Sequence, residues 1–124
     1  MSDIRTFVDG IFDELVAIRR DIHAHPETGM RETRTAALIR SELEKMGVDE
    51  IQQPLPTAVV ALIHGKKGAG KCVALRADID ALPVHEDTGL PFASQTEGIM
   101  HACGHDLHTT MLLGAAKTLC QMRD

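Results

Sequence analysis

The sequence predicts an α/β domain in which helices pack on a β-sheet. Two observations lead to this prediction: apolar residues recur at helical spacing near both ends of the chain, and the middle holds two short apolar runs rich in β-branched residues. The 124 residues suffice for one domain with a core, and a composition of 44% apolar and 25% charged residues is that of an ordinary globular protein.

Two helices are predicted in the first half of the chain. Apolar residues at three- and four-residue spacings between Ile4 and Leu15 indicate an amphipathic helix that continues to about Arg20. A second apolar stripe begins at about Glu32 and ends at Gly47, a residue type that commonly terminates helices. The first stripe is more typical of a helix packed in the core than of one that binds a partner.

Between these predicted helices lie His23 and His25. Pro26 disfavours helical backbone at the residue before it, and Gly29 favours a turn, so we expect both histidines on a non-helical connection. Spacing alone leaves two alternatives open: the histidines line a functional site, or they are ordinary loop histidines.

The middle of the chain predicts two buried strands. Residues 58–63 and 72–77 are short apolar runs, and the glycine-rich segment 65–70 would form the turn between them. The second run ends in Asp78 and Asp80, at the kind of strand end where α/β sheets carry their chemistry. Strand-end aspartates are also common turn formers, so a structural role is the alternative.

The strongest candidate site is the segment 98–108, which holds three histidines, a cysteine and an aspartate. Cys103 and His105 flank Gly104, and a thiolate with a neutral imidazole suits zinc and its transition-metal neighbours. An apolar stripe from Leu107 onward indicates that a helix begins at this point, and a helix N-terminus favours the thiolate form of a cysteine. The alternative is a small buried cysteine with histidines that cap the helix.

Charge and composition narrow the class of partner. A net charge of -5 without a basic run argues against nucleic acid, and no apolar run is long enough to span a membrane, so we expect a small-molecule partner. Three cysteines at unrelated spacings form no disulfide framework, which favours the cytoplasm. Gly65, Gly70 and Lys71 match a phosphate-loop spacing, but a strand-like run follows, so we predict no nucleotide cofactor.

Three long motifs occur in order along the chain: RRDIHAHPE at 19–27, LRADIDALPVHE at 75–86 and MHACGHD at 100–106. Together they resemble the N-terminal portion of the M20 metallopeptidase family, specifically its amidohydrolase branch, which includes hippurate hydrolase. The resemblance implies a zinc-peptidase-like catalytic domain that binds two divalent metal ions, such as zinc, manganese, cobalt or nickel. It implies that Cys103 and His105 are metal ligands.

The same resemblance implies that Asp80 is the catalytic aspartate that steadies the metal centre. Asp78 falls where other M20 branches carry a ligand histidine, so we do not assign it as a ligand. The implied reaction is metal-dependent hydrolysis of N-acyl amino acids, including hippurate-like substrates, to a carboxylic acid and an amino acid.

We expect residues 1–124 to form the N-terminal part of the metal-dependent catalytic domain, without the lid and dimerisation domain. The family's catalytic glutamate pair and later ligand histidines have no counterpart here, and two ligands are fewer than zinc sites usually have, so we expect the chain to be inactive alone. An incomplete sheet edge would favour self-association. The alternatives are one half of a split enzyme and a non-catalytic oligomeric remnant.

Overall fold

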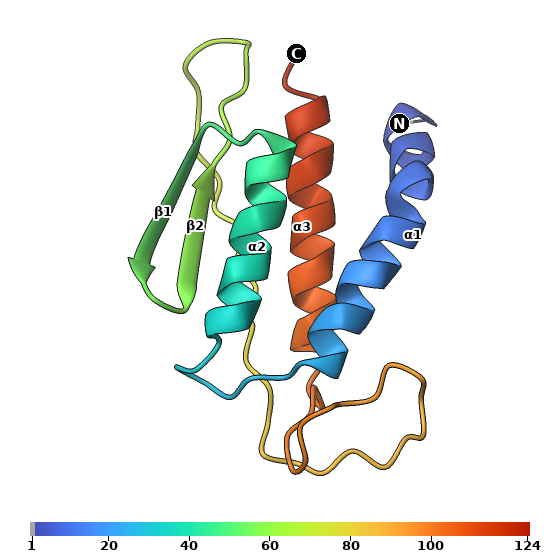
Figure 1. The fold of residues 1–124 in the computed structure, drawn as a ribbon. Helices are drawn as coiled ribbons and strands as arrows, with labels where there is room; N and C mark the ends of the chain where they lie inside the picture. Colours follow the sequence, from blue (N-terminus) through green and yellow to red (C-terminus); the bar gives the residue numbers. More distant parts are fainter. Residues whose placement is uncertain (1) are drawn as a thin grey trace.

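The computed structural model describes residues 2–124, and its elements confirm the predicted α/β class. Three helices pack side by side, and a two-stranded antiparallel sheet lies against α2 (Figure 1). In chain order the elements are α1 (Ser2–Ala24), α2 (Thr33–Met46), β1 (Glu50–Leu55), β2 (Ala58–Leu62) and α3 (His105–Gln121). None of the helices in the described part of the chain is long and apolar enough to cross a membrane.

The hydrophobic core lies where α2 meets α3. Ile39 and Leu43 of α2 and Leu113 of α3 are buried there, and partly buried residues of α1 and the sheet pack around them. Removing apolar surface from water is the main favourable contribution of these contacts, at about 25 cal/mol per Å². Gly114 lets α1 approach α3 closely, because a Cβ atom at this position would lie 3.0 Å from Leu15 Cδ1.

Both helices predicted in the first half of the chain are present. Helix α1 is one turn longer than predicted and includes His23, so the expectation that His23 lies on a non-helical connection is wrong. Nothing in the sequence breaks the helix until Pro26 constrains His25, which lies outside α1 as predicted. Helix α2 ends at Gly47, whose φ of 70° is a left-handed conformation that favours glycine.

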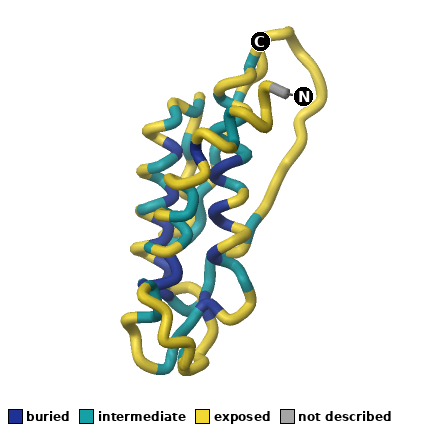
Figure 2. The backbone as a smooth tube through the Cα atoms, turned by 90° about the vertical axis from the view of Figure 1, so that its right-hand side faces the viewer, coloured by how far each residue is buried: buried dark blue, intermediate teal, exposed yellow. Residues whose placement is uncertain are grey.

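The sheet differs from the prediction. Residues 58–62 form β2, but its partner is β1, a polar segment that contains Pro54 and has no strand-like apolar pattern. The predicted strand at 72–77 is wrong: this segment forms neither helix nor strand, and Val73 is 79% exposed. Figure 2 shows a long loop on one side of the molecule that is exposed along most of its course. An apolar run becomes a buried strand only with neighbouring strands, and none in the described chain pairs with this one.

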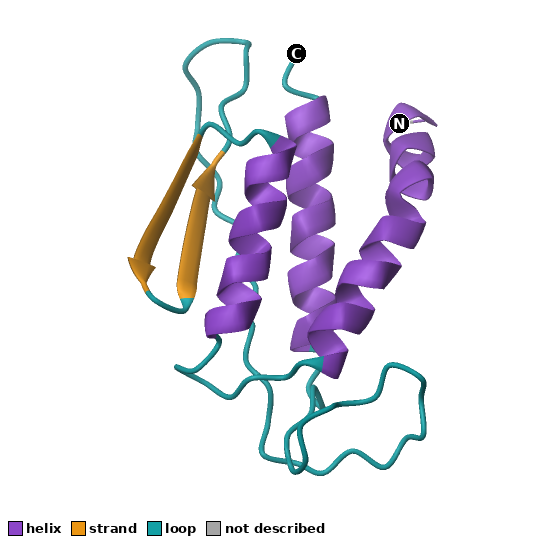
Figure 3. Cartoon of the chain, viewed as in Figure 1, coloured by secondary structure: helices purple, strands orange, loops and turns teal. Residues whose placement is uncertain are grey.

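A long connection, residues 63–104, contains no helix or strand (Figure 3). Isolated backbone pairings hold it in place: Ala81 N donates to Glu27 O at 2.8 Å, and Leu82 and Met100 exchange two hydrogen bonds of 2.9 and 3.0 Å. These pairings bring the chain directly after Asp80, the connection after α1 and the segment before α3 to one end of the molecule.

Candidate metal centre

The predicted ligand segment lies at the N-terminus of α3, as the sequence indicated. His105 is the first residue of the helix, and Gly104 before it has φ 89°, a conformation that L side chains rarely adopt. The carbonyl of Gly104 accepts hydrogen bonds from the backbone N–H groups of Leu107 and His108, each at 3.0 Å. Cys103 is exposed on the loop that leads into the helix. Gly104 therefore turns the chain sharply between the two predicted ligands.

The structure brings Asp80 and His105 into contact across 25 positions of sequence. The Nδ1 atom of His105 lies 2.9 Å from Asp80 Oδ1 and 3.0 Å from the Asp80 carbonyl oxygen. Both oxygens only accept hydrogen bonds, so Nδ1 carries the proton and Nε2 keeps its lone pair. A carboxylate behind a histidine is the usual support of a metal-binding imidazole. These residues therefore fit a metal ligand and its supporting aspartate.

Asp78 has a different environment, although it is two residues from Asp80. Its side chain pairs with the exposed guanidinium of Arg76 at 2.6 Å, and its carbonyl oxygen accepts a hydrogen bond from Thr109 of α3 at 3.2 Å. Asp78 thus holds the connection against α3 through its backbone. Its exclusion from the predicted ligands stays a prediction.

The described residues do not complete a metal site. No group of three or more His, Cys, Asp or Glu side chains within 2–124 is arranged to hold an ion. Cys103 and His105 are the two donors that the sequence predicted for this segment. Their assignment as ligands, and that of Asp80 as the catalytic aspartate, remain predictions.

A buried polar cluster lies beside this segment, and the sequence did not reveal it. Its members are Arg19 and His23 of α1, Glu86 and His101 of the long connection, and Asp106 of α3; we call it the His23 cluster. His23 Nδ1 lies 2.7 Å from Asp106 Oδ2, and His23 Nε2 lies 3.1 Å from Glu86 Oε1. Each of these residues belongs to a recognised motif or adjoins one, but contacts across 83 and 63 positions cannot be read from spacing.

Two members of the His23 cluster have shifted pKa values. Burial raises the pKa of Glu86, but hydrogen bonds from Thr88, the Ser94 N–H and His23 outweigh it and lower the pKa to about 2. Burial lowers the pKa of His101, and the nearby charge of Asp106 opposes that effect. Glu86 is therefore a carboxylate at neutral pH, and the neutral form of His101 is favoured.

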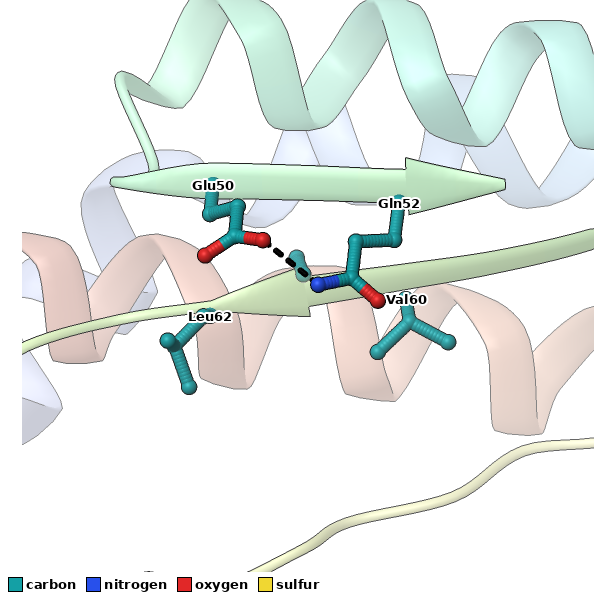
Figure 4. A pocket seen from close by; sticks show the side chains of 5 residues that line it. Glu50, Gln52, Val60 and Leu62 are labelled. Atoms are coloured by element: carbon teal, nitrogen blue, oxygen red, sulfur yellow. Dashed lines mark hydrogen bonds between the residues drawn. The ribbon is translucent and has the colours of Figure 1, made fainter. Parts of the chain in front are cut away.

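Two hollows on the described surface are shallow. One is on the sheet and is lined by Glu50, Gln52, Val60 and Leu62, with a hydrogen bond between the first two (Figure 4). The other is lined by the loop around Glu86, including the exposed His85. The first hollow contains none of the predicted site residues, so it does not compete with the segment at the start of α3 as the candidate centre.

Comparison with known sequences supports the predicted family. Residues 74–124 match the model of peptidase family M20/M25/M40. The chain is 45% identical, over 99% of its length, to an N-acyl-L-amino acid amidohydrolase of Geobacillus stearothermophilus. It is 50% identical, over its whole length, to thermostable carboxypeptidase 1 of Saccharolobus solfataricus. It spans about a third of these relatives, 33% and 32% of their lengths.

Solved structures show the same likeness. A Bacillus subtilis protein described as a dinuclear metal-binding peptidase of the M20 family matches with a TM-score of 0.87 at 45% identity, covering 93% of this chain and 32% of that one. A protein of methicillin-resistant Staphylococcus aureus, assigned as an aminohydrolase, matches with a TM-score of 0.91 at 41% identity, covering 100% and 33%. The fold and the motifs are similar to part of the α/β domain of peptidases and amidohydrolases. Within that class, the sequence and structure matches are to the M20 peptidase family, whose family model covers residues 74–124.

Proposed function

We propose that this chain supplies part of the metal centre of an enzyme that hydrolyses the amide bond of N-acyl amino acids. The observation that carries the proposal is the contact of Asp80 with His105 Nδ1, which leaves Nε2 available as a ligand, two residues along the chain from the exposed Cys103. A histidine with only a structural role needs no ring nitrogen with a free lone pair, whereas a metal ligand does.

Cys103 Sγ and His105 Nε2 would hold the metal, and Asp80 would fix the orientation of the imidazole. A thiolate and an imidazole favour zinc, cobalt or nickel over magnesium and calcium, with zinc and cobalt the best match to sulfur. Manganese prefers oxygen ligands, so it is proposed on the resemblance to the family alone. When bound, such ions polarise an amide carbonyl and lower the pKa of water. The description of the Bacillus subtilis relative as dinuclear supports two ions per complete site.

The names of the relatives support one substrate class. They include an amidohydrolase of N-acyl amino acids, a carboxypeptidase and an N-acetylcysteine deacetylase. In the substrate of each, the amide nitrogen belongs to an amino acid with a free carboxylate. We propose that feature as the common element of recognition, with hippurate as a simple aromatic example.

The remaining ligands and the general base would come from polypeptide other than residues 2–124. Catalytic zinc sites usually have three protein ligands, and this chain offers two in the proposed place. We therefore expect the 124-residue chain to bind metal weakly and to be inactive on its own. A complementing chain that brought the missing groups would restore hydrolysis.

The test is the zinc content of the purified chain at equilibrium with free zinc, determined by elemental analysis after dialysis against a zinc-containing buffer. We compare the wild type with Cys103→Ala and His105→Ala, and use His85→Ala, an exposed loop histidine, as the matched control. Hydrolysis of hippurate and of N-acetyl amino acids is assayed on the same samples.

The proposal predicts that zinc is retained by the wild type and by His85→Ala and lost in both ligand variants. Equal zinc in all four proteins, or none in the wild type, would contradict it. Hydrolysis by the wild type alone would show that a second copy supplies the missing groups, and would overturn the expectation of inactivity.

A further inference from the structure

The His23 cluster contacts the chain on both sides of the proposed ligand pair, Cys103 and His105. One side is the loop before Cys103, and the other is the helix that begins at His105. Asp106 directly follows His105 in α3 and is 1% exposed. Its Oδ2 atom lies 2.7 Å from His23 Nδ1 and 2.9 Å from Arg19 Nε. These contacts link the last turn of α1 to the first turn of α3, one residue after the proposed ligand His105.

The opposite edge of the His23 ring holds the loop that leads to Cys103. His23 Nε2 lies 3.1 Å from Glu86 Oε1, and Glu86 in turn accepts hydrogen bonds from Thr88 Oγ1 at 2.6 Å and from the Ser94 N–H at 2.7 Å. One imidazole therefore connects the loop before Cys103 with the helix that begins at His105. The Phe92 ring packs edge-on against the His23 ring, with 5.6 Å between the ring centroids. This contact restricts the rotation of the His23 ring further.

Burial strengthens the hydrogen bonds between His23 and its two carboxylate partners. The His23 side chain is 5% exposed and that of Glu86 3%, so solvent cannot replace a lost hydrogen bond. Without the His23 ring, Asp106 would keep only Arg19 as a partner, and Glu86 would keep Thr88 and Ser94. A buried carboxylate that loses one of its donors is less well compensated for burial, and the backbone that carries it is expected to move. For Asp106 that backbone is continuous with His105.

We infer that His23 is a positioning residue of the proposed metal centre, acting through Asp106 on His105. The inference rests on the proposed function. It adds His23, a residue that would act on the ligands only through Asp106. The link through Nδ1 to Asp106 is the important one, and the link through Nε2 to Glu86 is secondary, because only Asp106 adjoins a ligand.

Two conservative substitutions separate these links. The amide nitrogen of His23→Asn takes the place of Nδ1 and can donate to Asp106, whereas that of His23→Gln takes the place of Nε2 and can donate to Glu86. Cobalt(II) is the probe, because its charge-transfer absorption with a thiolate reports Cys103 directly. The chain is titrated with cobalt(II), and Cys103→Ala identifies the thiolate band.

We expect His23→Gln to weaken cobalt(II) binding by about 10- to 100-fold, the range measured for supporting residues of metal ligands, and His23→Asn to retain binding within about threefold of the wild type. Ile39→Val controls for general loss of stability, because Ile39 lies in the core away from the cluster and the change costs about 0.5–1.5 kcal/mol. Its cobalt(II) affinity should match that of the wild type.

Equal affinities of His23→Asn and His23→Gln, or an equal loss in Ile39→Val, would overturn the inference while leaving the proposed function intact. A wild type without a thiolate–cobalt band would instead contradict the proposed function, and the inference with it. If His23→Gln does not fold, Asp106→Asn replaces it. The same loss of cobalt(II) affinity is expected, because this change removes the negative charge that both His23 and Arg19 contact.

Discussion

At the scale of single residues, the contact between Asp80 and His105 is the feature on which the candidate site depends. The sequence placed both residues in recognised motifs and at the ends of expected elements, so their roles could be predicted. Their contact could not, because it requires the Leu82–Met100 pairing that folds the connection back on itself. The His23 cluster escaped prediction for the same reason: its contacts join residues that spacing does not relate.

Asp80→Ala should lower zinc affinity by about tenfold, near the lower end of the range for supporting carboxylates. The loss is limited because the Asp80 carbonyl oxygen lies 3.0 Å from His105 Nδ1 and still accepts a hydrogen bond from Nδ1–H after the side chain is removed. Competition with a chromophoric chelator measures the affinity. An unchanged affinity would show that the carboxylate does not support the ligand.

Glu86 should make stability depend on pH in the acid range. Its pKa in the folded state, about 2, lies below the unfolded value of 4.5, so the unfolded chain binds the proton more readily. The stabilisation is complete above about pH 4.5 and is lost as the pH falls towards 2.

The comparison variant for this dependence is Glu86→Gln, which cannot titrate. We expect it to be less stable than the wild type by roughly 1–2 kcal/mol at pH 7, and the difference to shrink as the pH falls from 4.5 towards 2. Urea unfolding at several pH values measures both chains. A difference that does not change with pH would exclude Glu86 as the titrating group.

At the scale of elements, the sequence predicted the helices well and the sheet poorly. A helix satisfies its own backbone, so the periodicity of α1, α2 and α3 and the stop at Gly47 were sufficient. A strand needs a partner. The polar segment β1 pairs with β2 despite its composition, whereas the apolar run 72–77 has no partner among residues 2–124 and is not a strand.

The start of α2 shows how a motif residue can serve the fold. Glu32, next to the helix, makes no side-chain capping bond, whereas Glu27 accepts hydrogen bonds from the N–H groups of Arg34 at 3.0 Å and Thr35 at 2.7 Å. Burial raises the pKa of Glu27, and these bonds, with those from the hydroxyls of Thr35 and Thr33, lower it overall. Glu27 thus caps α2 from a preceding loop.

Glu27→Ala should therefore destabilise the chain by about 1 kcal/mol, the usual cost of removing a helix cap. Glu32→Gln, which removes a neighbouring charge without removing a cap, is the matched control and should have a smaller effect. Thermal unfolding followed by circular dichroism compares the two. If Glu32→Gln were the more destabilising change, the cap would have been assigned to the wrong residue.

At the scale of the whole molecule, the described chain leaves apolar surface uncovered. Val73 and Leu75 of the unpaired segment are 79% and 59% exposed, and Leu107 and Met111 on α3 are 47% and 60% exposed. The apolar stripe predicted for α3 therefore lies largely at the surface, and its buried face is formed by other residues: Asp106, Thr109, Thr110, Leu113 and Gly114. Exposed apolar surface of this kind favours association.

We expect the isolated chain to self-associate through the segment 72–77, whose backbone and side chains are both unpartnered by any described strand. Leu75→Lys should shift the chain towards monomer in sedimentation velocity at micromolar concentration. Lys71→Glu, a charge change just outside the segment, should leave the association unchanged. A wild type that sediments as a monomer at all concentrations would contradict this expectation.

The central claim is that Cys103 and His105 hold one metal ion. X-ray absorption at the zinc edge of the zinc-loaded chain tests it most directly. We predict a sulfur neighbour at about 2.3 Å and a nitrogen neighbour at about 2.0–2.1 Å, with the sulfur signal absent in Cys103→Ala. A spectrum with only oxygen and nitrogen neighbours in the wild type would contradict the account.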